Sequence, residues 1–305
     1  MLDPQGLRQR SDMLQAIRAF FLERSYIEVD TPIRLPVLIP EAHLVPVPSD
    51  GAFLQPSPEL CMKQLLARGC SRIFQICHCF RKHEQGRLHQ PEFTMLEWYH
   101  KGWDYIALME ECEALLATLA EQLSSLPGLV RASQLRWQDC LVQLQPPWER
   151  LRVADAFARY AGMSAVEAIC ADRFDEILVT EVEPHLGRVR PTFLYDYPVE
   201  LGSLARRSPE NPEVSERFEL YIAGIELANG FSELADPNEQ RQRFVNEIEM
   251  MRSQGHPAFM PERFLASLPH MGEAAGIALG IDRLFMLFAG KHSLAESIPF
   301  LFADL

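Results

Sequence analysis

The sequence has no apolar run long enough to cross a membrane, and its N-terminus, MLDPQGLRQRSDML, has no hydrophobic region of the signal-peptide kind. We therefore expect a cytoplasmic protein. The sequence also contains no internal repeat, low-complexity tract or obvious linker. A chain of 305 residues can bury one large core or two smaller ones, and the absence of a linker favours a single domain over residues 1–305.

The cysteines do not form a recognisable framework. There are seven, an odd number, and none lies in a Cys-x-x-Cys pair, which argues against both a disulfide scaffold and a ribbon-type zinc site. Cys77, His78 and Cys79 are adjacent, but alternate residues of a strand face opposite sides, so the three cannot converge on one metal ion. We expect buried thiols instead.

Positive charge is also scarce. Lys and Arg total 29 against 42 Asp and Glu, a net charge of -13, which argues against a broad nucleic-acid-binding surface. One short stretch departs from this composition, because residues 80–100, FRKHEQGRLHQPEFTMLEWYH, gather five basic or imidazole side chains before an apolar strand. A local anion site is therefore possible within an acidic protein.

Apolar residues at helical spacing predict helices at about 7–24, 58–68, 104–123 and 237–253. Other segments have the composition of strands: SRIFQICHCFR, PEFTMLEWYH, PTFLYDYP, RFELYIAG, IELANGFSE and AGIALGID. Strands alternating with segregated helices predict an α+β fold, an antiparallel β-sheet flanked by helices. We interpret residues 104–190 as a variable helical part with few candidate site residues.

The first candidate constellation is a hairpin whose loop carries the cations of residues 80–100. Alternation after Pro91 places one set of side chains on a common face: Phe93, Met95, Glu97 and Tyr99. Cations suit phosphates, an aromatic ring suits a base, and a carboxylate suits an ammonium group, so a nucleotide and a cationic substrate would fit here. The alternative is a solvated hairpin tip.

The second constellation is RFELYIAGIELANGFSEL, which carries Glu219, Glu226 and Glu233 on apolar strands. A turn at 222–223 would place Glu219 opposite Glu226, where like charges repel unless a cation such as magnesium lies between them. A turn at 223–224 would shift the pairing by two. Three side chains alternate onto one face downstream: Asn229, Phe231 and Glu233. The alternative interpretation is a set of surface carboxylates.

The third constellation is GIALGIDRLFMLFAG, a strand of small residues that leads into a helix. We predict Asp282 as the N-cap and Arg283 in the first turn. Because a helix N-terminus favours anions over cations, Arg283 is expected to contact an anion of its own. Gly276 and Gly280 would let a ligand approach the backbone, although ordinary glycine packing is the alternative.

Together these segments resemble the signature motifs of class II aminoacyl-tRNA synthetases, and within that class the lysine enzymes. The first motif corresponds to the helix and strand that end at Pro32, the second to FRKHEQGRLHQPEFTMLEWY, and the third to GIALGIDRL. PSPELCMKQLL, PTFLYDYP and FELYIAGIELANGFSEL add to the match, which spans most of the chain outside 104–190. The resemblance implies the class II synthetase catalytic domain.

The resemblance also implies residue roles in activating an amino acid with ATP. Arg81 would contact the α-phosphate and the substrate carboxylate, His89 the γ-phosphate, and Arg283 the other side of the triphosphate, which makes Arg81 and Arg283 the catalytic pair. Phe93 would stack on adenine. The remaining roles are Mg²⁺ on Glu219 and Glu226, the lysine side-chain ammonium on Glu233 and Tyr99, and the amino end of the substrate on Glu59, Glu97 and Asn229.

Two departures from the lysine enzymes are informative. The first motif begins almost at residue 7, which predicts that no N-terminal anticodon-binding domain is present. Ala278 stands where those enzymes usually have glycine, and its methyl group would favour an amine moved by one carbon. Both departures match truncated paralogues that activate (R)-β-lysine and attach it to a lysine of translation elongation factor P. In a third departure, His83 replaces a glutamate that recognises adenine, and Glu84 follows it.

The resemblance further implies a homodimer, and we expect no tRNA partner and no membrane association. Two alternatives stay open at this point. The first alternative to the β-lysine ligase is a truncated enzyme that activates α-lysine for a tRNA or another protein acceptor. The second is a non-catalytic relative that binds an amino acid or regulates a partner. Retention of Arg81, His89, Glu226 and Arg283 together argues against a non-catalytic protein, because a simple binder needs no triphosphate contacts.

Overall fold

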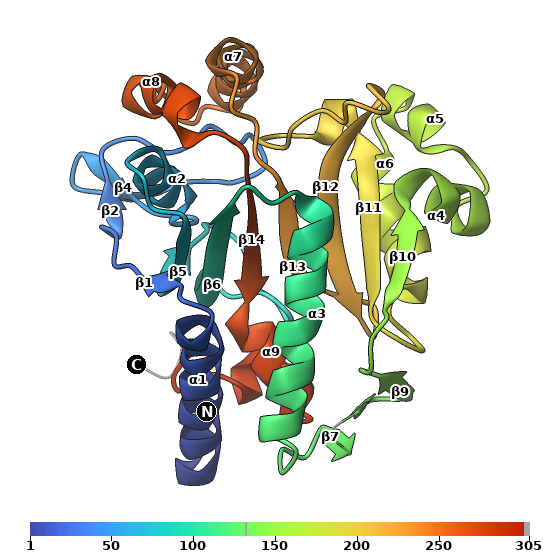
Figure 1. The fold of residues 1–305 in the computed structure, drawn as a ribbon. Coiled ribbons are helices and arrows are strands. Elements are labelled where there is room, and N and C mark those ends of the chain that lie inside the picture. Colours follow the sequence, from blue (N-terminus) through green and yellow to red (C-terminus); the bar gives the residue numbers. More distant parts are fainter. Residues whose placement is uncertain (132, 302–305) are drawn as a thin grey trace.

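The computed structural model describes residues 1–131 and 133–301, and its central element is an eight-stranded β-sheet (Figure 1). In spatial order the strands are β1 (Ile27–Glu28), β5 (Arg72–Phe80), β6 (Glu92–Lys101), β14 (Ala274–Gly280), β13 (Ile225–Ser232), β12 (Val214–Ile222), β11 (Thr192–Pro198) and β10 (Glu149–Arg152). Adjacent strands are antiparallel except at the two edges, where β1 pairs with β5 and β10 with β11 in parallel. The predicted α+β class is confirmed.

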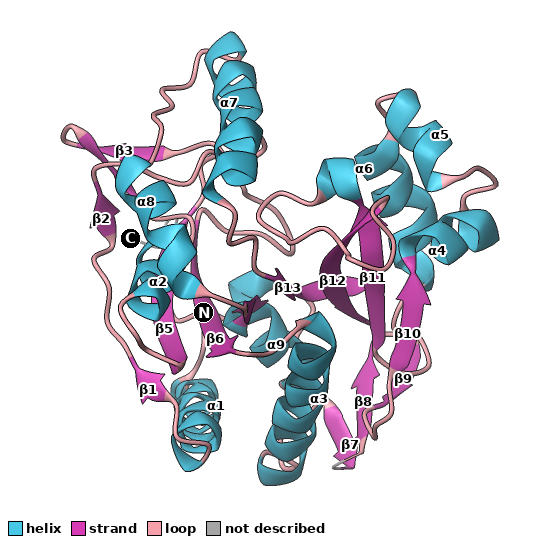
Figure 2. Cartoon of the chain, turned by 45° about the horizontal axis from the view of Figure 1, so that its top comes forward, coloured by secondary structure: helices cyan, strands magenta, loops and turns pink. Residues whose placement is uncertain are grey.

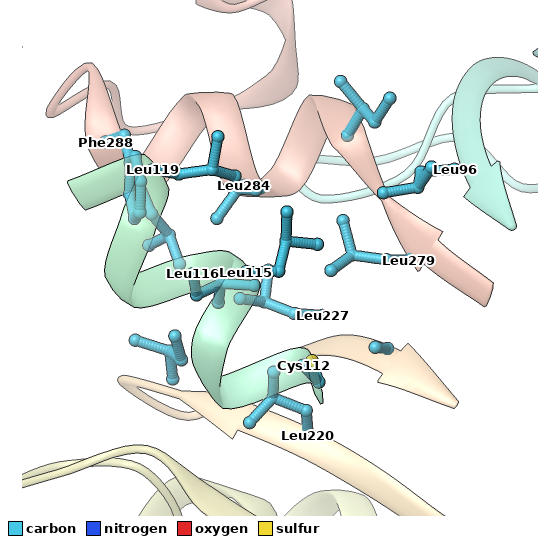
Figure 3. Packing of buried hydrophobic residues seen from close by; sticks show 14 of the residues in the cluster. Leu96, Cys112, Leu115, Leu116, Leu119, Leu220, Leu227, Leu279, Leu284 and Phe288 are labelled. Atoms are coloured by element: carbon cyan, nitrogen blue, oxygen red, sulfur yellow. The ribbon is translucent and has the colours of Figure 1, made fainter. Parts of the chain in front are cut away.

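One face of the sheet is covered by α1 (Pro4–Glu23), α3 (Tyr105–Gln122) and α9 (Ile281–Phe288). Every second residue of the central strands enters this core, including Leu96, Leu220 and Leu279, and leucines of α3 pack over them (Figure 3). The side chains between these positions must therefore face the opposite side of the sheet, because the period of a strand is two.

The opposite face is covered only in part, by two separate groups of helices (Figure 2). One group is α2 (Glu59–Ala67), α7 (Pro237–Ser253) and α8 (Glu262–Met271), and the other is α4 (Val153–Tyr160), α5 (Ala165–Cys170) and α6 (Phe174–Ile177). The first group has a core with residues such as Ile73 and Tyr99, and the second with Leu194 and Tyr197. The central strands lie between the two groups.

Two small sheets complete the fold. β2 (Arg34–Leu35), β4 (Ala52–Leu54) and β3 (Val47–Ser49) form one, and β7 (Leu129–Arg131), β8 (Gln134–Trp137) and β9 (Cys140–Gln143) form the other. The prediction that residues 104–190 are helical was therefore incomplete, because this stretch also holds β7 to β9 and the edge strand β10. These strands have three or four residues each, too few for their alternation to be recognised in the sequence.

The predicted N-cap role of Asp282 was wrong. Helix α9 begins at Ile281 with Gly280 as its N-cap. The Asp282 carboxylate instead forms an ion pair of 2.5 Å with Arg10 of α1 and accepts a hydrogen bond of 2.7 Å from the Thr94 backbone N–H. A buried cation and a strand amide thus outcompete the helix amides for this carboxylate. Their contact ties α1, β6 and α9 together.

The β12–β13 hairpin resolves the open question of register. Its turn lies at Ala223 and Gly224, both with positive φ, and Ile222 pairs with Ile225. A bulge after Leu220 then shifts the pairing, so that Glu219 lies opposite Asn229 and Tyr221 opposite Glu226. The direct cross-strand pairing of Glu219 with Glu226 was wrong, and the later of the two predicted turns is correct.

The core under the sheet allows a test of stability. Leu116→Ala in α3 removes a side chain with no solvent exposure and should destabilise the protein by about 2–5 kcal/mol, the usual cost of a cavity in a packed core. Urea unfolding measures this change. Leu141→Ala on β9, where the leucine is 42% exposed, is the matched control and should change the free energy of unfolding much less. Equal losses in the two variants would contradict the assignment of the core.

Candidate active site

The sheet face between the two helix groups bounds a cavity of about 590 Å³. Eleven predicted site residues line it: Glu59, Arg81, His89, Phe93, Glu97, Tyr99, Glu219, Glu226, Asn229, Ala278 and Arg283. Glu233, the other predicted residue, is buried beneath the lining and ion-paired to Lys63. These residues come from separate segments of the chain, and the register of β6, β14, β13 and β12 brings them together.

One end of the cavity is rich in carboxylates. Glu97 accepts hydrogen bonds from the Ser57 hydroxyl, at 2.6 Å, and from the Tyr99 hydroxyl. Burial, and then the charge of Glu59, raise the pKa of Glu97 to about 8. Burial likewise raises the pKa of Glu233 to about 8. Such carboxylates are strongly attractive to an ammonium group, which would allow them to ionise.

Lys63 in α2 was missed in the sequence. Its ammonium group lies 2.5 Å from Glu59 and 2.5 Å from Glu233, and only 2% of the residue is exposed. The spacing of Glu59 and Lys63, four residues apart on a predicted helix, was a signal for the first ion pair. The contact with Glu233 depends on the packing of α2 against the end of β13, and no local pattern predicts it.

Ala278 lies in the middle of this end of the cavity. In the sheet register it is the partner of Glu97 on β6 and of Asn229 on β13. Its methyl group therefore lies between two of the side chains predicted for the amino end of the substrate. Gly276, two residues earlier on the same strand, faces Tyr99 and Glu233.

The other end of the cavity carries cations. The Arg81 guanidinium lies 5.2 Å from the centre of the Phe93 ring and 3.7 Å from Glu84. The Arg81 Nε is buried and has no hydrogen-bond partner among the described residues, as suits a group that awaits an anion. Glu84 lines the cavity, whereas His83 is exposed and has a φ of 68°. Of these two residues, Glu84 is therefore the one that can face an adenine ring in the cavity.

Arg283 is the second cation that lines the cavity, and both it and Arg81 are close enough to act on His89 and Glu226. Arg283 donates hydrogen bonds to the Glu226 backbone carbonyl, at 2.7 Å, and to the Leu88 carbonyl, at 3.2 Å. Its Nη2 lies 2.7 Å from the His89 Nε2. Burial, and then the charge of Arg283, lower the pKa of His89, so the neutral ring accepts this hydrogen bond. Both arginines and His89 are thus available to one anionic ligand.

Glu219 and Glu226, the predicted magnesium ligands, lie in the same part of the cavity but differ in their contacts. Glu219 accepts three hydrogen bonds of 2.6 Å, from Arg217, Tyr197 and Tyr221. Burial, and then the charge of Glu219, raise the pKa of Glu226, which is a reason for a cation to bind beside it. Among the described residues no cluster of three acidic, histidine or cysteine side chains is arranged to hold a metal, so the magnesium site stays a prediction.

Arg217 is the second residue that the sequence analysis missed. It lines the cavity, bonds Glu219, and donates a 3.2 Å hydrogen bond to the Asn229 side-chain carbonyl. Asn229 is thereby oriented with its side-chain NH₂ group free for other contacts. The cavity as a whole offers carboxylates for ammonium groups at one end and cations for a polyphosphate at the other, the arrangement required to join an amino acid to a nucleotide.

The comparisons with known proteins agree with this geometry. Residues 4–302 match the family tRNA synthetases class II (D, K and N), and the chain belongs to that family. Its relatives include proteins named Elongation factor P--(R)-beta-lysine ligase. It is 38% identical to the one from Edwardsiella ictaluri over 313 residues, and 40% identical to the one from Pectobacterium carotovorum over 317 residues. Each match covers 97% of this chain and 94% of the relative.

Gly276 gives a test of the carboxylate end. In Gly276→Ala, a Cβ atom would lie 2.2 Å from the Tyr99 ring and 2.6 Å from the Glu233 carboxylate, so both side chains must move. The affinity for lysine or a similar diamino acid should fall roughly tenfold or more, as overpacking usually costs. Calorimetry measures it. Gly86→Ala, whose Cβ meets no atom within 4 Å, should bind as the wild type does, and equal affinities in all three proteins would contradict this site.

The raised pKa values predict a pH dependence. Below pH 8, Glu97 and Glu233 hold protons that an ammonium ligand must displace, so affinity for a diamino acid should rise as pH rises from 6 to 8. The change is up to about tenfold per pH unit for each group. Dissociation constants measured across this range test it, and Glu97→Gln, which removes one of the two titrating groups, should show a weaker pH dependence. A constant affinity for the diamino acid would contradict the assignment.

Proposed function

We propose that the protein activates (R)-β-lysine with ATP and transfers the β-lysyl group to a lysine side chain of translation elongation factor P. It is a ligase of the class II synthetase family. The observation that carries the proposal is a cavity with carboxylates suited to ammonium groups at one end and cations suited to phosphates at the other. The register of one β-sheet brings the two ends together. Along almost its whole length the chain is similar to proteins named Elongation factor P--(R)-beta-lysine ligase.

The residues of the cavity support a two-step reaction. In the first step, an oxygen of the substrate carboxylate attacks the α-phosphorus of ATP in line, and pyrophosphate leaves. Arg81 and Arg283 neutralise the charge that develops, and Phe93 stacks on the adenine. In the second step, the amine of the acceptor lysine attacks the carbonyl carbon of the β-lysyl adenylate, loses a proton, and AMP leaves. Positioning and electrostatics suffice, so no covalent enzyme nucleophile is needed.

ATP and Mg²⁺ are the proposed cofactors. Glu226 is the better placed of the two proposed magnesium ligands, because its carboxylate has one contact of 3.3 Å, with Arg283, whereas Glu219 accepts three hydrogen bonds of 2.6 Å. When bound, the ion would neutralise phosphate charge. At the carboxylate end, Glu233 and Tyr99 would hold the side-chain ammonium of (R)-β-lysine, and Glu59, Glu97 and Asn229 its β-amino group.

The proposed setting follows from the same features. A protein acceptor is favoured over tRNA because the net charge of -13 opposes binding to a polyphosphate chain. We also propose that the protein acts in the cytoplasm as a homodimer. Among the described residues, no helix is long and apolar enough to span a membrane. The second candidate function is activation of α-lysine for another acceptor. The two substrates differ in the position of the amino group that would face Ala278.

The first experiment is ATP–pyrophosphate exchange with (R)-β-lysine and α-lysine at matched subsaturating concentrations, followed by transfer to purified elongation factor P. Exchange should be faster with (R)-β-lysine, and transfer should add one β-lysyl group to the factor. Preference for α-lysine would favour the second candidate. Exchange with neither amino acid would contradict both candidates and favour a non-catalytic protein.

Ala278→Gly tests the basis of this preference. Removing the methyl group between Glu97 and Asn229 should raise kcat/KM for α-lysine relative to (R)-β-lysine by roughly tenfold, the usual value of one methyl group in substrate discrimination. Ala275→Gly is the matched control, because Ala275 lies on the same strand but faces the core on the other side of the sheet. This substitution should leave the ratio unchanged. An unchanged ratio in Ala278→Gly would show that selectivity resides elsewhere.

A further inference from the structure

Lys63 places an ammonium group beneath the part of the cavity lining proposed to bind the ammonium groups of the substrate. Its Nζ contacts Glu59 and Glu233 at 2.5 Å each and lies 4.9 Å from the centre of the Phe231 ring. Burial opposes the charge, but the carboxylates of Glu233 and Glu59 outweigh it and raise the pKa of Lys63 above its ordinary value. Lys63 is therefore a fixed cation rather than a nucleophile.

Within the group formed by Glu59, Glu97, Glu233 and Lys63, the charges match the two ammonium groups of the substrate only when Lys63 is included. Glu59, Glu97 and Glu233 supply three negative charges when ionised, and (R)-β-lysine supplies two ammonium groups. Lys63 supplies the third positive charge. Without it, three carboxylates would face two cations, and like charges this close retain a shared proton instead of ionising.

The surroundings of Lys63 contain few other ionisable groups. Tyr99 reaches Glu97 from β6, and burial raises the pKa of its hydroxyl well above the ordinary value, so it stays neutral. Glu41, in the loop before β3, has a pKa raised to about 7 by burial and then by Glu59, and Lys63 is among the cations that oppose this rise. Lys63 therefore interacts with Glu41 and Glu97 as well as with its two ion-pair partners.

We infer that Lys63 is a positioning residue for the amino-acid substrate, which holds the Glu59 and Glu233 carboxylates in place so that a diamino acid can complete the charge balance of this group. This inference rests on the proposed function for the identity of the substrate. A lysine that served only to stabilise α2 would affect folding, but it would not change the response of substrate binding to pH.

Lys63→Met keeps most of the unbranched apolar stem of the side chain and removes its charge. In pyrophosphate exchange, KM for (R)-β-lysine should rise about tenfold or more while KM for ATP changes less than about twofold. The pH at which amino-acid affinity reaches half its maximum should move upward, because Glu97 and Glu233 hold their protons more tightly without the nearby cation. Calorimetry at pH 8.5 in two buffers should record more protons released on binding, on the order of one.

Two further variants make the test specific. Lys101→Met removes a lysine of β6 whose ammonium group bonds the Leu66 carbonyl outside the cavity, and it should leave both KM values and the pH midpoint unchanged. Lys63→Met/Glu59→Gln removes one charge of each sign, and its pH midpoint should return toward that of the wild type. Lys63→Gln replaces Lys63→Met if the latter does not fold.

Unchanged KM and pH midpoint in folded Lys63→Met would overturn the inference, as would an equal rise in KM for ATP and for the amino acid. Failure of the proposed function has a different signature, because wild-type protein would then give no exchange with (R)-β-lysine. In that case the proton count on binding of lysine or (R)-β-lysine, compared between wild type and Lys63→Met, still decides the role of Lys63.

Discussion

The antiparallel register of β6, β14 and β13 is the constraint on which the site depends. Ala278 is paired with Glu97 on one side and with Asn229 on the other, and Gly276 is paired with Tyr99 and Phe231. The residues between these positions are buried under α1, α3 and α9, so a slip of one residue would move the core into the cavity and the site into the core. The energy of the core therefore also fixes the geometry of the site.

The two ends of the cavity carry groups of opposite charge. Burial, together with the neighbouring carboxylates, raises the pKa of Glu97 and Glu233 at one end. At the other end burial, together with the arginines, lowers the pKa of His89, and the buried Arg81 Nε has no hydrogen-bond partner among the described residues. Each end is incomplete in a way that a ligand of the opposite charge corrects. The Asp282 carboxylate, by contrast, already has partners in Arg10 and the Thr94 amide and contributes rigidity instead.

Much of this was predictable because the signals are local. Alternation along one strand was enough to place Phe93, Met95, Glu97 and Tyr99 on one face, and the resemblance to class II synthetases supplied the roles. Lys63 and Arg217 were missed because the contacts that bring them to the site, with Glu233 and with Asn229, are made to other elements. Asp282 was misassigned for the same reason, since a cation distant in sequence captured its carboxylate. The strands of residues 129–152 are too short for periodicity to identify them.

The floor of the cavity under the substrate is made largely of backbone. Gly276, Ala278 and Gly280 occupy the cavity-facing positions of β14, so the strand presents almost no side chains there while its other face stays packed against the helices. At Ala278, unlike at the tightly covered Gly276, the depth of the floor can therefore change by a single carbon atom while the helix-covered face of the strand keeps its packing. A scaffold built in this way can acquire a new amino-acid preference through one substitution, and its stability would place little restraint on that change.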